Sequence, residues 1–232
     1  MVNPDTARTV VGIIGNAISV GLFLSPIPTF LRIIRHKSVH HFKPDPYSAT
    51  ILNCALWVFY GMPFVHPDST LVVTINGFGL FIQAAYISIF FIYSSWGKMK
   101  KMIVILLVEI IFFAGVVLIT LNAFHTTTGR STLVGSLCVA FNIIMYSSPL
   151  TVMKMVIKTK SVKYMPFWLS VASLCNGVVW FIYALIKFDP WVAVPNGLGA
   201  LSGVVQLVLY AVYYKTTDWD ETDPKEVQLP EP

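Results

Sequence analysis

The chain has 232 residues, of which 56% are hydrophobic and 12% charged, and its mean hydropathy is +0.71. Soluble domains carry roughly 25% charged residues, so the composition excludes a soluble protein and indicates an integral membrane protein. The formal net charge of +5 is small and calls for no nucleic-acid partner.

Seven segments are long and apolar enough to cross a bilayer as helices, because about 20 apolar residues span its ~30 Å hydrocarbon core. In chain order they are residues 9–31, 46–64, 70–94, 102–122, 132–153, 166–186 and 191–214. Their continuous apolar character differs from the short alternating strands of a barrel. Cys54, Cys138 and Cys175 fall inside them and are expected to be buried free thiols. The predicted fold is an all-α integral membrane protein.

The first three segments recur as the last three. Ser25-Pro26, Lys37-Ser38-Val39, Asn53, Trp57 and Tyr60 return 123 residues later as Ser148-Pro149, Lys160-Ser161-Val162, Asn176, Trp180 and Tyr183. Asn76-Gly77 returns 120 residues later as Asn196-Gly197. Three helices are an odd number, so two copies joined directly would insert with opposite topology. The unrepeated fourth segment restores the orientation and predicts two parallel repeats in a 3+1+3 arrangement.

The expected organisation follows from this duplication. Residues 1–94 form the first three-helix repeat, and 95–131 hold the linker helix with its flanking loops. Residues 132–216 form the second repeat, and the acidic residues 217–232 form a disordered cytosolic tail.

Positive charge predicts the orientation in the lipid bilayer. If alternate connections share one side, 13 of the 16 Lys and Arg residues lie on that side. The positive-inside rule then places the N-terminus outside, or in a lumen, and the C-terminus in the cytosol. We expect the plasma membrane, with the vacuolar membrane as the alternative.

Polar side chains at mid-membrane depth indicate a binding site. Asn53 and Trp57 are four residues apart and share a helix face, an arrangement that Asn176 and Trp180 duplicate. Asn76 and Asn196 enter the membrane from the outer side. Amides donate to and accept from hydroxyl groups, while indoles pack on the C–H face of a sugar ring. A single Asn–Trp pair would suggest interhelical packing, but its duplication favours a polyhydroxylated solute.

Other titratable residues do not form a catalytic or metal-binding pattern. His36, His40 and His41 lie in a basic loop that is expected to be solvated, so no enzyme, metal or cofactor is predicted. Glu109 is the only acidic residue deep in a segment and could relay protons. Because it lies outside both repeats, we expect a protonated or interface-bonded carboxyl group and downhill transport.

Four prolines mark where the helices can bend. Pro26 and Pro149 lie inside segments, where each removes a backbone hydrogen bond, so we expect repeated kinks that act as hinges. Pro46 and Pro166 lie near segment starts, where proline is tolerated.

Several motifs together resemble one transporter family. The first repeat contains Phe-Leu-Ser-Pro, Tyr-Gly-Met-Pro-Phe and Thr-Ile-Asn-Gly. The second contains Thr-Lys-Ser-Val-Lys-Tyr-Met-Pro-Phe and Val-Pro-Asn-Gly-Leu-Gly. From about residue 6 to 215 the chain resembles the plant SWEET family of sugar transporters (the MtN3/saliva type), and its hexose-carrying members most closely.

The resemblance implies bidirectional, ion-uncoupled sugar transport by alternating access, without a cofactor, in a homo-oligomer that is often a trimer. It implies a substrate pocket of Asn76, Asn196, Trp57, Trp180, Asn53 and Asn176. It also implies a cytosolic proline tetrad of Pro26, Pro46, Pro149 and Pro166, and an outer gate of Tyr60 and Asp189. Sucrose carriers have smaller residues where this chain has Asn53 and Asn176, so a monosaccharide such as glucose is expected.

Three other classes compete with this interpretation. Proton-coupled amino-acid transporters of the PQ-loop class carry Pro-Gln where this chain has Pro26-Ile27 and Pro149-Leu150. A seven-helix receptor explains the helix count but not the duplication. A non-selective channel would not show saturable uptake.

Overall fold

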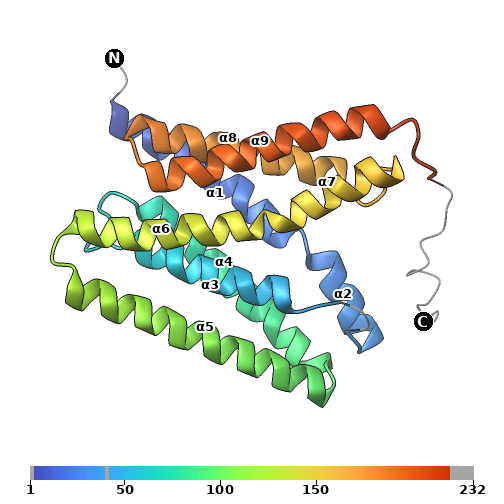
Figure 1. The fold of residues 1–232 in the computed structure, drawn as a ribbon, viewed down its shortest axis with the longest axis horizontal. Coiled ribbons are helices and arrows are strands. Elements are labelled where there is room, and N and C mark those ends of the chain that lie inside the picture. Colours follow the sequence, from blue (N-terminus) through green and yellow to red (C-terminus); the bar gives the residue numbers. More distant parts are fainter. Residues whose placement is uncertain (1–2, 40–41, 220–232) are drawn as a thin grey trace.

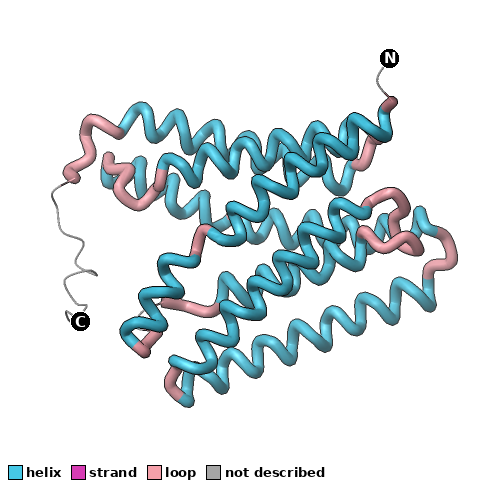
Figure 2. Tube along the Cα trace, turned by 180° about the vertical axis from the view of Figure 1, so that it is seen from behind, coloured by secondary structure: helices cyan, strands magenta, loops and turns pink. Residues whose placement is uncertain are grey.

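The structure is a computed structural model that describes residues 3–39 and 42–219 (Figure 1). The described residues form nine helices and no strand (Figure 2). The helices are α1 (Pro4–Leu24), α2 (Ile27–His36), α3 (Asp45–Tyr60), α4 (Thr70–Tyr93), α5 (Trp96–Ala123), α6 (Thr127–Met145), α7 (Ser147–Thr159), α8 (Phe167–Ile186) and α9 (Pro190–Tyr213). This confirms the all-helical fold. His40, His41 and the predicted tail from residue 220 onward lie outside the described residues.

Two of the seven expected spans are each made of two helices. Helices α1 and α2 together extend over Pro4–His36, and α6 and α7 over Thr127–Thr159. Among the described residues, six helices or helix pairs are long and apolar enough to cross a membrane. The exception is α3, which has 16 residues and a length of only ~24 Å. The predicted segment 46–64 is therefore too long, because the chain leaves the helix at Gly61, and Pro63 and Pro67 supply no backbone N–H to continue it.

The helix interruptions coincide with the repeated Ser-Pro motif. Pro26 cannot donate to Leu22 O, and both the N–H and the hydroxyl group of Ser25 bond to that carbonyl instead, at 3.2 and 2.8 Å. In the second repeat the break falls at Tyr146, and Pro149 stands in the first turn of α7. A helix interruption therefore lies at or near the Ser-Pro motif in each repeat, and the hinge role stays a prediction.

The repeated Lys-Ser-Val motif terminates a helix in each copy. Lys37 and Lys160 adopt left-handed backbone conformations, with φ of 50° and 56°. Their N–H groups bond to the last helical carbonyls, which closes the helix with a left-handed cap. Val39 and Val162 follow and are buried, so each copy anchors the chain before it turns.

Helix packing follows the duplication. Helix α1 packs on α4 of its own repeat and on α8 of the other, just as α6 packs on α9 and on α3. Helix α5 packs on α3 and α6 at the edge of the bundle (Figures 1 and 2). Gly15 allows the close approach of α1 and α8, since a Cβ there would lie 2.9 Å from the Trp180 indole. The first helix of each repeat thus forms the interface between the repeats.

One cysteine differs from expectation. Cys54 and Cys138 are buried free thiols, as predicted, but Cys175 is exposed. It lies on α8, two residues before the buried Gly177 that packs against α9, and on a different face of the helix. The periodicity of a helix in a continuously apolar segment does not show which of its faces is covered.

Candidate functional site

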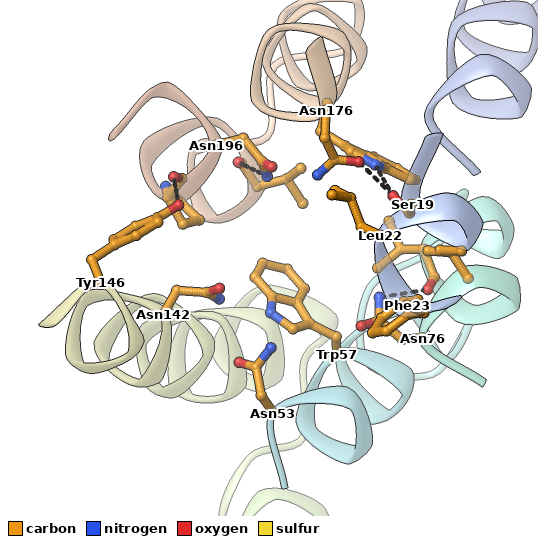
Figure 3. A pocket seen from close by; sticks show the side chains of 15 residues that line it. Ser19, Leu22, Phe23, Asn53, Trp57, Asn76, Asn142, Tyr146, Asn176 and Asn196 are labelled. Atoms are coloured by element: carbon orange, nitrogen blue, oxygen red, sulfur yellow. Dashed lines mark hydrogen bonds between the residues drawn. The ribbon is translucent and has the colours of Figure 1, made fainter. Parts of the chain in front are cut away.

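A cavity of about 230 Å³ lies between the two repeats (Figure 3). Its lining includes all six residues predicted to bind substrate, namely Asn53, Trp57, Asn76, Asn176, Trp180 and Asn196. They come from α3 and α4 of one repeat and α8 and α9 of the other. The structure therefore brings the duplicated amides and indoles together around one space.

The cavity has an internal pseudo-symmetry. Every lining residue except Leu22 has a counterpart in the other repeat that also lines the cavity. The pairs are Ser19 with Asn142, Phe23 with Tyr146, Asn53 with Asn176, Trp57 with Trp180, Val72 with Val192, Ile75 with Pro195, and Asn76 with Asn196. None of these residues carries a charge, so the cavity suits a neutral polar ligand.

Two of the amides have their nitrogens already bonded. Asn76 Nδ2 donates to Val72 O at 2.9 Å, and Asn196 Nδ2 donates to Val192 O at 2.8 Å. Both bonds run to the carbonyl one turn earlier in the same helix, which fixes the two side chains in equivalent positions. Each amide oxygen can then accept a hydrogen bond from a ligand hydroxyl, and the second N–H of each amide can still donate one.

The other amide pair is not symmetric. Ser19 Oγ donates to Asn176 Oδ1 at 2.5 Å and accepts from Trp180 Nε1 at 3.1 Å, so the second-repeat pair is fixed by a serine from α1. Asn53 Oδ1 is buried and has no hydrogen-bond partner among the described residues. A buried acceptor without a partner is energetically costly, so the two repeat-related amides differ in how their oxygens are satisfied.

Sequence reasoning did not identify Ser19, Asn142 and Tyr146 as lining residues. Asn142 lies beside Trp57 in Figure 3, and Tyr146 donates to Pro195 O across the cavity wall. The signal for them was the same 123-residue offset, which pairs Ser19 with Asn142 and Phe23 with Tyr146. Because the residue types differ within each pair, a search for identical residues overlooks them.

The predicted outer-gate residues are in contact. Tyr60 Oη donates to Asp189 Oδ1 at 2.8 Å, and both side chains are buried. Asp189 also caps α9 by accepting from the N–H groups of Trp191 and Val192. The carboxylate therefore ties the end of α3 to the start of α9.

A histidine adds to this contact. His66 Nε2 lies 3.3 Å from Asp189 Oδ2, its ring stacks on Tyr60 with centroids 4.6 Å apart, and its Nδ1 lies 3.1 Å from Ser131 Oγ. Burial lowers the pKa of His66 below its ordinary value, and Arg8 lowers it further, while the Asp189 and Asp68 carboxylates act in the opposite direction. His66 is the repeat counterpart of Asp189 at the 123-residue offset.

Further charged side chains make contacts at the same end of the molecule. Lys187 Nζ lies 2.5 Å from Asp5 Oδ1 and 3.3 Å from Asp68 Oδ2. Arg8 Nη1 donates to Asp68 O at 2.7 Å, and its guanidinium lies 4.3 Å from the centre of the Tyr183 ring. These contacts thus hold the loops together at the end of the bundle that lies away from the Lys-Ser-Val motifs.

The four prolines do not gather at one cavity. Pro149 and Pro166 line a second cavity in the second repeat, whereas Pro26 and Pro46 line neither this cavity nor the central one. Pro46 lies in the first turn of α3, and Pro166 precedes the first residue of α8, as expected for helix starts.

Glu109 lies away from the central cavity. Its Oε1 accepts a hydrogen bond of 2.7 Å from Ser48 on α3, while its Oε2 is buried without a partner among the described residues. The carboxyl group therefore joins the linker helix to the first repeat. No group of three or more potential metal ligands occurs within residues 3–39 and 42–219.

The chain is similar to known sugar transporters. A family model described as "Sugar efflux transporter for intercellular exchange" matches residues 9–98 and again residues 132–218. The bidirectional sugar transporter SWEET5 of Arabidopsis thaliana is 58% identical over 96% of this chain and 93% of its own length. The bidirectional sugar transporter SWEET7b of Oryza sativa subsp. indica is 57% identical over 99% of this chain and 86% of its own length. A solved eukaryotic SWEET transporter superimposes with a TM-score of 0.88 at 38% identity, covering 91% of this chain and 99% of that one.

Proposed function

We propose that this chain, which belongs to the SWEET family of sugar transporters, carries glucose-like monosaccharides across its membrane in both directions without coupling to an ion. The proposal follows from the central cavity, where repeat-related amides and indoles surround one space that carries no charge. Sugar hydroxyls both donate and accept hydrogen bonds, as amides do, and an indole face suits the C–H face of a pyranose.

The size of the cavity favours one sugar ring. Its volume of about 230 Å³ lies below the roughly 300–1,000 Å³ of sites for drug-sized ligands. Asn53 and Asn176 line it from opposite repeats and limit its width (Figure 3). The central cavity by itself accommodates one sugar ring, so a hexose is the expected substrate.

Alternating access is supported by the contacts at the two ends of the bundle. Tyr60, Asp189 and the ion pairs of Lys187 hold the outer end together. Both repeats have a helix interruption near Pro26 or Pro149, on the side of the cavity away from these contacts. Bending there, with Pro46 and Pro166 at adjacent helix starts, would close the other end as the outer end opens.

The absence of a charged residue from the cavity lining supports transport without ion coupling. Proton-coupled transporters place carboxylate or histidine relays in the substrate pathway. Glu109, the only acidic residue deep in a predicted span, bonds to Ser48 and does not line the cavity. The proton-coupled PQ-loop alternative is therefore not favoured.

The orientation and assembly are also proposals. The lysine-rich connections favour a cytosolic position for both Lys-Ser-Val motifs and for the end of α9, with the N-terminus outside the cell. We expect the plasma membrane as the location and a homo-oligomer, a trimer by resemblance, as the assembly.

Uptake of radiolabelled glucose into proteoliposomes tests the function, with and without a pH gradient and with sucrose as competitor. We expect saturable uptake that resists sucrose and reaches the same final level with and without the gradient. Uptake that requires a proton gradient would contradict uncoupled transport, and efficient competition by sucrose would contradict a monosaccharide site.

A further inference from the structure

The second repeat contains a cavity of its own. We call it the second-repeat chamber; its polar lining includes Ser148, Ser170, Ser173, Ser202 and Gln206, and its volume is about 410 Å³. Tyr146, Asn176 and Asn196 line both this chamber and the central cavity, so the two spaces adjoin. The chamber lies on the side of the central cavity toward the Lys-Ser-Val end, between α7, α8 and α9.

The corresponding region of the first repeat is filled by aromatic rings. Tyr47 and Tyr86 occupy the positions of Ser170 and Gln206 at the 123- and 120-residue offsets. The Tyr86 ring stacks on Phe30 with centroids 4.0 Å apart and lies 5.6 Å from the Tyr47 ring. In the second repeat the same two positions are joined by a hydrogen bond of 2.9 Å from Ser170 Oγ to Gln206 Oε1. Equivalent backbone positions thus hold a packed aromatic cluster in one repeat and a polar chamber in the other.

The lining of the chamber indicates the chemistry of its ligand. No lining residue is an Asp, Glu, Lys, Arg or His, so a charged ligand would find no partner. Gln206 Nε2 donates to Ser202 Oγ at 3.3 Å, which extends the hydrogen-bonded row begun by the buried Ser170. Val152 and Leu169 supply apolar wall between the hydroxyl groups. Hydroxyls beside short apolar surfaces match a neutral polyhydroxylated ring.

We infer that the second-repeat chamber is a second monosaccharide position, which the sugar occupies between the central cavity and the Lys-Ser-Val end. The inference rests on the proposed function, because it assumes that the substrate is a monosaccharide. Among the described residues the second repeat has this position, whereas the aromatic cluster lies in the equivalent region of the first. The sugar pathway is therefore asymmetric within a duplicated fold.

Thiol protection in purified full-length protein tests the chamber directly. Ser173→Cys in a Cys175→Ser background places one reactive thiol in the lining, because Cys54 and Cys138 are buried. We call this introduced group the chamber thiol. At a glucose concentration of about twice the Kd, a methanethiosulfonate reagent should label it about threefold more slowly, since a third of the chambers are then empty. Glycine betaine at equal osmolality should give no protection.

Two variants locate the protecting sugar. Thr50→Cys, the first-repeat counterpart of Ser173→Cys, should gain no protection from glucose, because the Tyr47 and Tyr86 rings pack in the equivalent region of its repeat. Asn53 lines the central cavity and not the chamber, so Asn53→Ala should weaken sugar binding in the central cavity alone. Protection of the chamber thiol should therefore persist in that background. Loss of protection in the Asn53→Ala background would overturn the inference and indicate one continuous site.

A filling substitution gives an independent measurement. The double variant Ser170→Tyr and Gln206→Tyr copies the aromatic pair of the first repeat and should abolish protection of the chamber thiol. Val208→Tyr adds a ring on an exposed face of the same helix and should leave protection intact. Protection that survives the double variant would overturn the inference.

The outcomes separate the two proposals. Glucose uptake by the unmodified protein without protection of the chamber thiol rejects the second position and leaves the proposed function standing. Protection without uptake rejects transport of glucose and leaves a binding chamber. The absence of both rejects both.

Discussion

Ser19 of the first repeat donates a hydrogen bond to Asn176 of the second, with Oγ and Oδ1 2.5 Å apart. The same hydroxyl group accepts from Trp180 Nε1 at 3.1 Å. One serine therefore fixes both the amide and the indole of the second-repeat pair. Asn53, the counterpart of Asn176, has a free buried carbonyl oxygen among the described residues. The second-repeat pair is therefore fixed before a ligand arrives, whereas the Asn53 oxygen has no partner among the described residues to fix it.

Removal of this hydroxyl group should weaken sugar binding. In Ser19→Ala the Asn176 amide and the Trp180 indole lose their common partner, a loss of about 1 kcal/mol. We expect the KM for glucose to rise roughly fivefold with an unchanged amount of protein in the membrane. Radiolabelled uptake measures this, with Ser88→Ala as the control because that hydroxyl bonds only within an exposed stretch of α4. An unchanged KM would mean that the second-repeat pair does not contact the sugar.

Asn76→Ala and Asn196→Ala should have equal effects. Both amides are held by the same one-turn hydrogen bond and present equivalent oxygens to the cavity. Each substitution should abolish glucose uptake while the protein still reaches the membrane, as judged by surface labelling. Normal transport by Asn196→Ala, or a large difference between the two, would refute a pseudo-symmetric pocket.

Acidification should loosen the outer end. The pKa of the half-buried His66 is lowered, so the closed end binds a proton less readily than an open end would. In an open end His66 would be solvated, with an ordinary pKa of about 6.5. The closed form is therefore favoured above that pH and loses stability as the pH falls toward the lowered pKa. A cysteine placed at Ile75, in the cavity lining, should be labelled faster from the outer side at acidic pH.

The groups around His66 act on its pKa in opposite directions. Asp189 and Asp68 favour the imidazolium, whereas burial and Arg8 oppose it, and burial is the largest of these effects. His66→Gln keeps the bulk of the side chain and should remove the pH dependence of labelling. Slower labelling in acid would indicate that the attraction between imidazolium and Asp189 prevails over burial.

Glu109→Gln should leave transport unchanged. Ser48 can donate to the amide oxygen as it does to the carboxyl group, and Glu109 does not line the central cavity. We expect equal glucose uptake by both proteins in proteoliposomes, with or without a pH gradient. A variant that loses uptake specifically under a gradient would assign Glu109 a proton-coupling role.

The duplication explains how much of the fold could be predicted. Two copies of an odd number of helices, with one unrepeated helix between them, predicted the 3+1+3 order of the spans along the chain. Identical residues at matched positions led directly to Asn53, Trp57, Asn76 and their counterparts. The αL caps at Lys37 and Lys160 explain why Lys-Ser-Val recurs, although the sequence alone did not reveal that role.

The features that sequence reasoning did not find arise where the repeats diverge. Ser19 and Asn142 occupy equivalent positions with different side chains, so identity could not point to them. The shortness of α3 reflects Gly61 and Pro63, which lie inside a run that hydropathy alone continues to residue 64. The exposed face at Cys175 depends on which neighbours cover α8, and that is decided by tertiary packing.

The first repeat has aromatic packing around Tyr86 where the second repeat has the chamber. This difference between the repeats has a kinetic consequence. A carrier that uses no energy source must bring sugar to the same concentration on both sides. The ratio of Vmax to KM is therefore the same for influx and efflux, whatever the shape of the pathway. An uneven pathway can still give the two directions very different KM values, provided that Vmax differs by the same factor. Half-saturation measured from one side of the membrane therefore does not describe the other.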